Sequence, residues 1–169
     1  MKCFNPHEAI SGEWQQNPEW QRELDRNIRE KLLPPIYFEH PVVVASKTPV
    51  HACTLYIDGT PTTKRGGVIG VWVYNQLSQT RHMVCVLRKN ILCKCGCKGW
   101  CTWYLVFRWL EWSSLCMAEC MYPSCKWNGI PYVVVADQRR AALAAGRAEL
   151  KSKAATIWSK GDWQEYATT

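Results

Sequence analysis

The sequence lacks a long uncharged apolar run and therefore predicts no transmembrane helix. Its most apolar stretch, residues 103–118, contains Arg108 and Glu111, and charged side chains are costly in the middle of a bilayer. The sequence also lacks a basic segment that leads into an apolar run after Met1, which argues against a secretory signal. We therefore expect an intracellular protein with reduced cysteines, and clustered reduced thiols hold metals more often than they form disulfides.

Neither an internal repeat nor a low-complexity segment is present, so the 169 residues, 47% of them apolar, are expected to form one core. We place a basic domain at residues 46–169 and assign residues 1–45 to an N-terminal helical arm and linker. The arm has 5 Lys and Arg against 7 Asp and Glu, whereas the domain has 16 against 7. A basic domain suits nucleic acid as a partner, and a charged, solvated surface is the alternative explanation.

Hydrophobic spacing predicts an α/β (α+β) fold. Residues 5–33 have apolar side chains at helical spacing, and Pro34-Pro35 ends this helix. A short apolar run at 42–45 predicts an edge strand. Period-two alternation then predicts three antiparallel strands, at 52–58, 67–75 and 81–88.

The second half of the sequence predicts helices and one further strand. Thr102 can cap a helix that runs to Glu119 and that is apolar around almost its whole circumference, so we expect it to be buried on more than one side. The remaining predicted elements are a short strand or extended piece at 132–136, a helix capped by Asp137 that runs to Lys151, and a strand at 154–159.

Four cysteines lie close together in the sequence: Cys93, Cys95, Cys97 and Cys101, in a C-x-C-x-C-x3-C arrangement. Thiolates suit tetrahedral Zn²⁺, and the glycines between them let the backbone fold the sulfurs around one ion. The sequence therefore predicts a structural zinc knuckle at residues 93–101. Because the spacing is tighter than in zinc ribbons, another cysteine could replace one of the four. The candidates for that replacement are Cys85, Cys116, Cys120 and Cys125. Unligated thiols, disulfides and an iron–sulfur cluster are the alternatives.

Two aspartates are candidate catalytic residues. Asp58 closes the first long strand and Asp162 follows the last one. An RNase-H-like fold runs as three antiparallel strands, a helix and a fourth strand beside the first, with catalytic aspartates on the first strand and at the end of the fourth. The predicted elements follow this order, which indicates an incomplete RNase-H-like core. Two carboxylates at neighbouring strand ends could hold Mg²⁺ for attack on a phosphodiester. Taken alone, Asp58 is better explained by an Asp-Gly turn, and Asp162 by a turn or a helix cap next to Gly161.

Two non-catalytic alternatives remain open. The first is a zinc-stabilised nucleic-acid-binding module with exposed tryptophans that stack on bases. Its candidate nucleic-acid ligands are Lys64, Arg65, Arg88, Lys89, Lys94 and Lys98. The second alternative is a protein-interaction subunit that docks on a larger assembly through the N-terminal arm.

Several segments also resemble a family of proteins. They are Leu55-Tyr-Ile-Asp58-Gly, Arg81-His82, Cys93-x-Cys-Gly-Cys-x-Gly-Trp-Cys101, the tryptophan-rich helix, and Lys160-Gly-Asp-Trp-x-Glu165. Together they are similar to predicted proteins that occur in many copies in dinoflagellate genomes, which we interpret as mobile-element (transposase-like) products. The resemblance covers about residues 50–169, and the cysteine motif is its most specific part.

The resemblance implies a nuclear, transposase- or integrase-like protein that cleaves or transfers DNA strands. Asp58 and Asp162 would be the first two members of an acidic triad. The sequence ends seven residues after Asp162, which leaves no room for a fifth strand, a last helix and a third acidic residue. We therefore expect the chain alone to be inactive or to be a degenerate copy.

Overall fold

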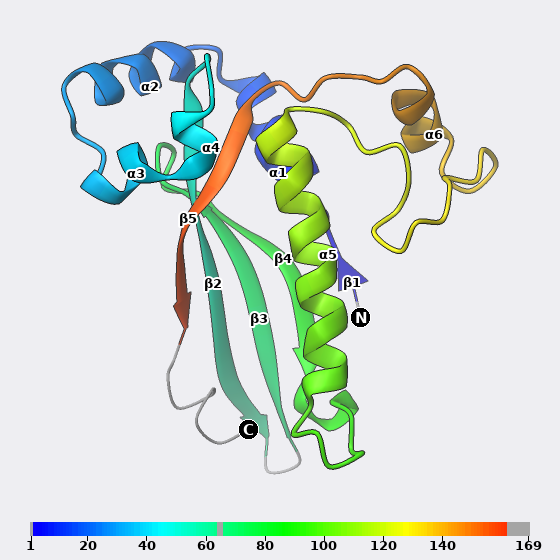
Figure 1. The fold of residues 1–169 in the computed structure, drawn as a ribbon. Helices are drawn as coiled ribbons and strands as arrows, with labels where there is room; N and C mark the ends of the chain where they lie inside the picture. The colour runs from blue at the N-terminus through cyan, green and yellow to red at the C-terminus, as the bar shows by residue number, and fades with distance from the viewer. Residues whose placement is uncertain (1, 64–65, 162–169) are drawn as a thin grey trace.

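The computed structural model describes residues 2–63 and 66–161, and Figure 1 shows their arrangement. Within this part of the chain, five strands form one mixed sheet in the order β1-β4-β3-β2-β5. The strands are β1 (Lys2–Cys3), β2 (Val50–Thr63), β3 (Gly66–Asn75), β4 (Arg81–Arg88) and β5 (Lys153–Gly161). The helices are α1 (Pro6–Gln16), α2 (Trp20–Arg29), α3 (Pro35–Glu39), α4 (Pro41–Val44), α5 (Trp100–Glu119) and α6 (Gln138–Ala145), with a 3-10 helix η1 (Lys89–Ile91).

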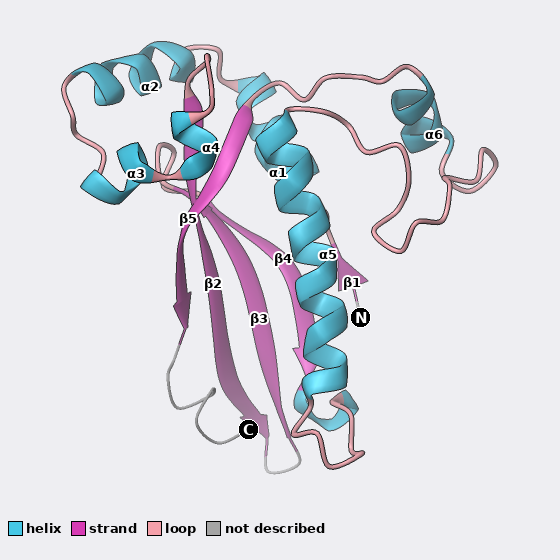
Figure 2. Ribbon diagram, viewed as in Figure 1, coloured by secondary structure: helices cyan, strands magenta, loops and turns pink. Residues whose placement is uncertain are grey.

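The sheet confirms the predicted mixed α/β architecture. Strands β2, β3 and β4 pair antiparallel, as their alternating sequences and short connections predict. Strand β5 pairs parallel with β2, from Val50 opposite Lys153 to Ile57 opposite Gly161. A parallel neighbour needs a crossover connection. The chain between β4 and β5 supplies it and contains α5 and α6 (Figure 2). The later strand therefore lies beside the first long strand.

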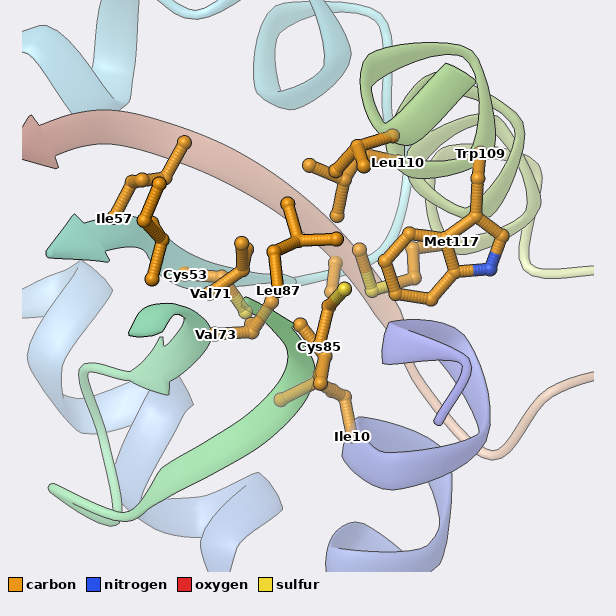
Figure 3. Packing of buried hydrophobic residues seen from close by; sticks show 14 residues of the cluster. Ile10, Cys53, Ile57, Val71, Val73, Cys85, Leu87, Trp109, Leu110 and Met117 are labelled. Carbon is orange, nitrogen blue, oxygen red and sulfur yellow. The ribbon is translucent and has the colours of Figure 1, made fainter. Parts of the chain in front are cut away.

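One face of the sheet packs against α1 and α5. Figure 3 shows the main core, in which buried side chains of β2, β3 and β4 meet those of the two helices. Helix α1 contributes Ile10, which is 1% exposed, so the segment predicted as an arm takes part in the core. Helix α5 contributes Val106, Trp109, Leu110 and Met117. Burial of this apolar set supplies the main stabilising free energy of the fold.

The opposite face of the sheet is covered only in part by α2, α3 and α4. Figure 1 shows these helices gathered at the end of the sheet where β2 and β5 begin. There they cover a second cluster that contains Val50, Ala52, Ala155 and Ile157. The Tyr37 hydroxyl at the centre of this cluster donates to the Val50 carbonyl over 2.7 Å. Farther along the strands, this face carries polar and aromatic side chains.

Two segments of the N-terminal half differ from prediction. The single helix predicted for 5–33 is two helices, because Pro18 cannot continue α1 and Asn17 before it has non-helical dihedral angles, with φ -135 and ψ 75. The apolar run at 42–45 is not an edge strand but lies in α4. Pro41 begins this helix, and His40 Nδ1 accepts the Val42 N–H over 3.3 Å. A cap and packing against the second cluster thus outweigh the β preference of valine.

The second half also differs at two places. Residues 132–136 form no strand in the described structure and are largely solvent-exposed, with Val135 95% exposed. Asp137 precedes α6 as predicted, but its side chain pairs with Lys126 over 2.7 Å instead of capping the helix. Helix α6 ends at Ala145 rather than at Lys151, since Gly146 follows it. The Arg140 guanidinium on α6 binds Glu8 of α1 through both carboxylate oxygens, at 2.6 and 2.9 Å, which fixes this segment on the body.

Helix α5 begins at Trp100, not at Thr102. Gly99 precedes it with φ 83, a left-handed conformation that glycine adopts without strain. The prediction of burial on more than one side is wrong, because Trp100, Tyr104, Leu105 and Leu115 are each at least 50% exposed. Among the helices in the described ranges, none has the length and apolarity that crossing a membrane requires.

Candidate metal centre and nucleic-acid surface

The four cysteines predicted as zinc ligands form one cluster between η1 and the first turn of α5. The sulfur atoms of Cys93, Cys95, Cys97 and Cys101 lie within 4.8 Å of one another. Four thiolates that each lie about 2.3 Å from a tetrahedral zinc ion are about 3.8 Å apart. The Cys95 and Cys101 sulfurs are 3.8 Å apart, which matches this value and is far longer than a disulfide bond. The cluster could therefore hold a metal ion, and its geometry is compatible with zinc.

Local backbone conformation brings these sulfurs together. Gly96 and Gly99 have φ of 89 and 83, and Lys98 has φ of 51, so the chain turns sharply between the cysteines. The Thr102 hydroxyl, predicted as a helix cap, instead accepts the Cys93 N–H over 3.0 Å and ties the start of the cluster to α5. These interactions position the thiols from short-range structure alone.

Hydrogen bonds within the cluster separate the pKa values of its thiols. The Cys101 N–H donates to Cys97 Sγ over 3.4 Å, and this bond is the main cause that lowers the pKa of Cys97 to about 6. Hydrogen bonding with Cys97 raises the pKa of Cys101 to about 12, and hydrogen bonding with Cys93 raises that of Cys95. One thiol is thus readily ionised, and a bound cation would favour ionisation of the others.

The cysteines considered as replacement ligands lie elsewhere. Cys85 is buried in the main core, and Cys116 is buried near the opposite end of α5. The Cys120 thiol donates to the Leu150 carbonyl over 3.3 Å. Within the described chain, no second group of three or more metal-binding side chains comes together. The metal-binding potential therefore rests on Cys93, Cys95, Cys97 and Cys101.

Asp58 lies on β2, on the sheet face opposite α5. It pairs with Gly70 of β3, and the Tyr56 hydroxyl donates to Asp58 Oδ2 over 3.4 Å. Strand alternation predicts that Thr54, Tyr56 and Asp58 share a face, and the structure places Cys53 and Ile57 in the core on the other side. Asp162, the second predicted catalytic residue, lies outside the described residues. Its predecessor Gly161 is the register partner of Ile57, the predecessor of Asp58.

The basic residues predicted to bind nucleic acid lie at one end of the sheet, as far as they are described. Arg88 ends β4, Lys89 begins η1, and Lys94 and Lys98 lie between the cysteines. Arg88, Lys94 and Lys98 are exposed and Lys89 is half-buried. Lys64 and Arg65 lie outside the described residues. Figure 1 shows that the connection before α5, which contains the cysteine cluster, lies at the end of the sheet where β2 and β5 finish.

Sequence reasoning missed a groove on the sheet face that carries Asp58. The groove has a volume of about 410 Å³ and is lined by Thr54, Tyr56, Trp72, Tyr74, Gln76, Arg81 and Lys160. The alternation along β2 and β3 was a signal for part of this set, because it places the aromatic residues of each strand on one face. Arg81 reaches the groove because β4 pairs with β3, and Lys160 reaches it because β5 pairs with β2. Alternation within one strand does not reveal these pairings.

Comparison of the sequence with models of known protein families and with curated proteins, and of the structure with solved structures, gave no match.

Proposed function

We propose that this protein is a nucleic-acid-processing domain of the transposase or integrase type with an RNase-H-like core. In this proposal Asp58 and Asp162 hold Mg²⁺, and the cysteine cluster holds a structural zinc ion. The observation that carries the proposal is the register of the parallel pair β2 and β5, in which Ile57 lies opposite Gly161. These two residues directly precede the two aspartates. The strand order β4-β3-β2-β5, with α5 between β4 and β5 in the chain, supports the same assignment.

The chemistry of such a site follows from its ligands. Mg²⁺ prefers oxygen ligands, and carboxylates on neighbouring strands can share ions despite their like charges. Mg²⁺ held by these residues would supply Lewis-acid chemistry for hydrolysis of a phosphodiester. In that reaction water adds to phosphorus, the bond from phosphorus to the bridging oxygen breaks, and a proton of the water passes to the departing oxygen. Asp58 would act as a metal ligand in this reaction, with Tyr56 orienting its carboxylate through the hydroxyl hydrogen bond.

Metal binding at Asp58 can be tested without turnover. Paramagnetic Mn²⁺ is titrated into the zinc-loaded protein while backbone amide NMR signals are recorded. We expect the signals of Ile57, Asp58 and Gly161 to broaden first, and Asp58→Asn to weaken Mn²⁺ binding roughly tenfold or more. Asp25→Asn is the matched control, because Asp25 is exposed on α2. Equal Mn²⁺ affinity of wild type and Asp58→Asn would contradict the proposal.

A cleavage assay complements the titration. Labelled DNA is incubated with the protein and Mg²⁺, and the products are separated by size. Any cleavage that belongs to this site is expected to disappear in Asp58→Asn and to persist in Asp25→Asn. Cleavage that is unchanged in Asp58→Asn would assign the activity to another site or to a contaminant.

A second candidate function is a non-catalytic, zinc-stabilised nucleic-acid-binding module. The exposed Lys94 and Lys98 favour it, because they flank the cysteines at the surface of the candidate metal centre. Their replacement by Gln should weaken binding and reduce the salt dependence of the affinity, by about 0.7–0.9 in the logarithmic slope for each phosphate that is no longer neutralised. Binding that depends on these lysines, together with no effect of Asp58→Asn on metal binding, would favour the module over the enzyme.

A further inference from the structure

The groove beside Asp58 combines aromatic rings with basic side chains. Tyr56 and Trp72 are direct cross-strand partners, and their ring centroids are 5.8 Å apart. Tyr74 pairs with Arg81 of β4. The Arg81 guanidinium carbon lies 5.9 Å from the ring centroids of both Tyr56 and Tyr74. The three rings are half-buried, so each keeps part of its surface open to the groove.

The two parts of this sheet face differ in chemistry. The part covered by α2, α3 and α4 is apolar and uncharged, with Val50 and Ala52 on β2 and Ala155 and Trp158 on β5. The part that forms the groove has no aliphatic residue in its lining and contains Thr54, Gln76 and two cations. A surface that packs against a helix is expected to be apolar and free of charge, as the covered part is. The groove instead suits a ligand with flat apolar groups and negative charge.

The position of Trp72 shows how closely this surface is built. A Cβ atom at Gly70 would lie only 2.0 Å from a carbon of the Trp72 indole, so the ring lies over the glycine. Gly70 is the cross-strand partner of Asp58. The absence of a side chain at position 70 therefore lets Trp72 lie along the sheet toward Asp58.

Nucleic-acid bases match these features. Bases stack on aromatic side chains and on the plane of an arginine guanidinium, and phosphates attract cations. The groove lining has Arg81 and Lys160 and no acidic side chain. Bases within a duplex are already stacked on one another, so their flat faces are open to aromatic side chains only where the strand is unpaired and unstacked.

We propose that this groove binds single-stranded nucleic acid, with bases stacked on Tyr56, Trp72 and Tyr74 and phosphates held by Arg81 and Lys160. The inference rests on the proposed function and deepens it, because it names an unpaired strand as the substrate class and leads that strand to Asp58. Tyr56 is two residues from Asp58 on the same face of β2, or about 6.6 Å along the strand. A strand in the groove would therefore pass beside the candidate catalytic carboxylate.

Fluorescence anisotropy tests the inference with fluorescein-labelled oligo-dT, oligo-U and a duplex of equal length. We expect both single strands to bind more tightly than the duplex, and a difference between them would separate DNA from RNA as the preferred ligand. Tyr74→Leu should raise the dissociation constant for a single strand by about 5- to 150-fold. Arg81→Gln should also raise it and reduce its salt dependence.

Matched variants on α5 serve as controls. Tyr104→Leu and Arg108→Gln make the same substitutions at exposed positions outside the groove. Both should bind like wild type. Thermal unfolding followed by circular dichroism checks that each variant is folded. Equal affinities of wild type, Tyr74→Leu and Arg81→Gln, or tighter binding of the duplex, would overturn the inference.

Photo-crosslinking of the wild-type protein to an oligonucleotide that contains 5-iodouridine needs no variant. Mass spectrometry should locate the adducts on Trp72 or Tyr74, and adducts confined to residues 93–101 would overturn the inference. The test is separate from that of the metal site. Groove variants that lose strand binding while Asp58→Asn leaves Mn²⁺ affinity unchanged would retain the binding surface and reject the enzyme. The reverse outcome would retain the enzyme and reject the surface.

Discussion

Two buried histidines should make the protein unfold in mild acid. His7 on α1 and His51 on β2 are 0% and 1% exposed. His7 Nδ1 lies 2.8 Å from the Ser113 hydroxyl of α5, whereas both ring nitrogens of His51 lack a hydrogen-bond partner within the described chain. Burial lowers the pKa of each ring from 6.5 to about 4, and a nearby carboxylate, Glu8 for His7 and Glu13 for His51, opposes this shift only in part.

The sign and size of the effect follow from these pKa values. Below pH 6.5 the histidines of the unfolded chain bind protons, whereas the folded protein takes them up only near pH 4. The free energy of unfolding should therefore fall as the pH drops through this window, by about 1.4 kcal/mol per pH unit for each ring. Over the whole window each histidine costs about 3 kcal/mol. Their sum approaches the total stability of a small domain, about 5–15 kcal/mol.

Urea unfolding followed by circular dichroism measures this dependence at several pH values within the window. In His51→Leu, which has no titrating ring at this position, the slope of the unfolding free energy against pH should fall to about half that of wild type. His7→Leu is the matched comparison, because the His7 ring is equally buried, and it should lower the slope by a similar amount. A wild-type slope below about 1 kcal/mol per pH unit, or an equal slope in His51→Leu, would refute the reasoning.

Three further predictions concern the packing of the sheet face, a buried hydrogen bond and the cysteine cluster. Gly70→Ala should lower the free energy of unfolding by about 1–3 kcal/mol in urea titrations, because the new methyl group overlaps the Trp72 ring. Gly12→Ala on α1 is the control: no atom lies within 4 Å of its new methyl group, so it should raise the free energy of unfolding by about 1 kcal/mol. Tyr37→Phe should lower the melting temperature, because it removes a buried hydrogen bond to the Val50 carbonyl, which contributes about 0.5–1.5 kcal/mol. Cys97→Ser should reduce zinc retained after dialysis, measured by a colorimetric chelator, yet leave the helical circular dichroism signal nearly intact, because the cluster lies outside the buried core.

The long strands and their order could be predicted because local pattern and global fold agree there. The segments 52–58, 67–75 and 81–88 direct alternate side chains into the main core over most of their length, and short turns join them, so the antiparallel pairing follows from adjacent segments. The clustering of the four cysteines could be predicted for the same reason, since all four lie within nine consecutive residues.

The errors arose where one local signal outweighed another or where tertiary packing decided. The Asn17-Pro18 pair predicts that the first helix ends there. The helical spacing of apolar residues continues across this pair and favoured a single helix instead. The valines at 42–44 favour a strand, yet Pro41 and His40 start a helix whose apolar side packs on the second core cluster. Trp100 could not be identified as the first helical residue, because Gly99 supplies the turn without a capping side chain.

The groove could not be predicted because it depends on a bulge in β5. Cys53 pairs with Thr156, but the next residue, Thr54, pairs with Trp158. Ile157 is thus an extra residue opposite the Cys53–Thr54 step, and its side chain is buried in the second core cluster. A bulge of this kind is a property of two strands that are about one hundred residues apart in the sequence, so the period of either strand alone does not reveal it.

This one residue determines which side chains of β5 reach the face of Asp58. Without the bulge, Tyr56 would lie opposite Ser159, and Lys160 would lie opposite Ile57, whose side chain is in the apolar core. A lysine directed there would be an unpaired buried charge, which is costly. With the bulge, Lys160 lies opposite Tyr56 and lines the groove, and Gly161 lies opposite Ile57. The position of Lys160, one of the two cations of the proposed strand-binding surface, and the register on which the proposed metal site depends therefore share one structural cause.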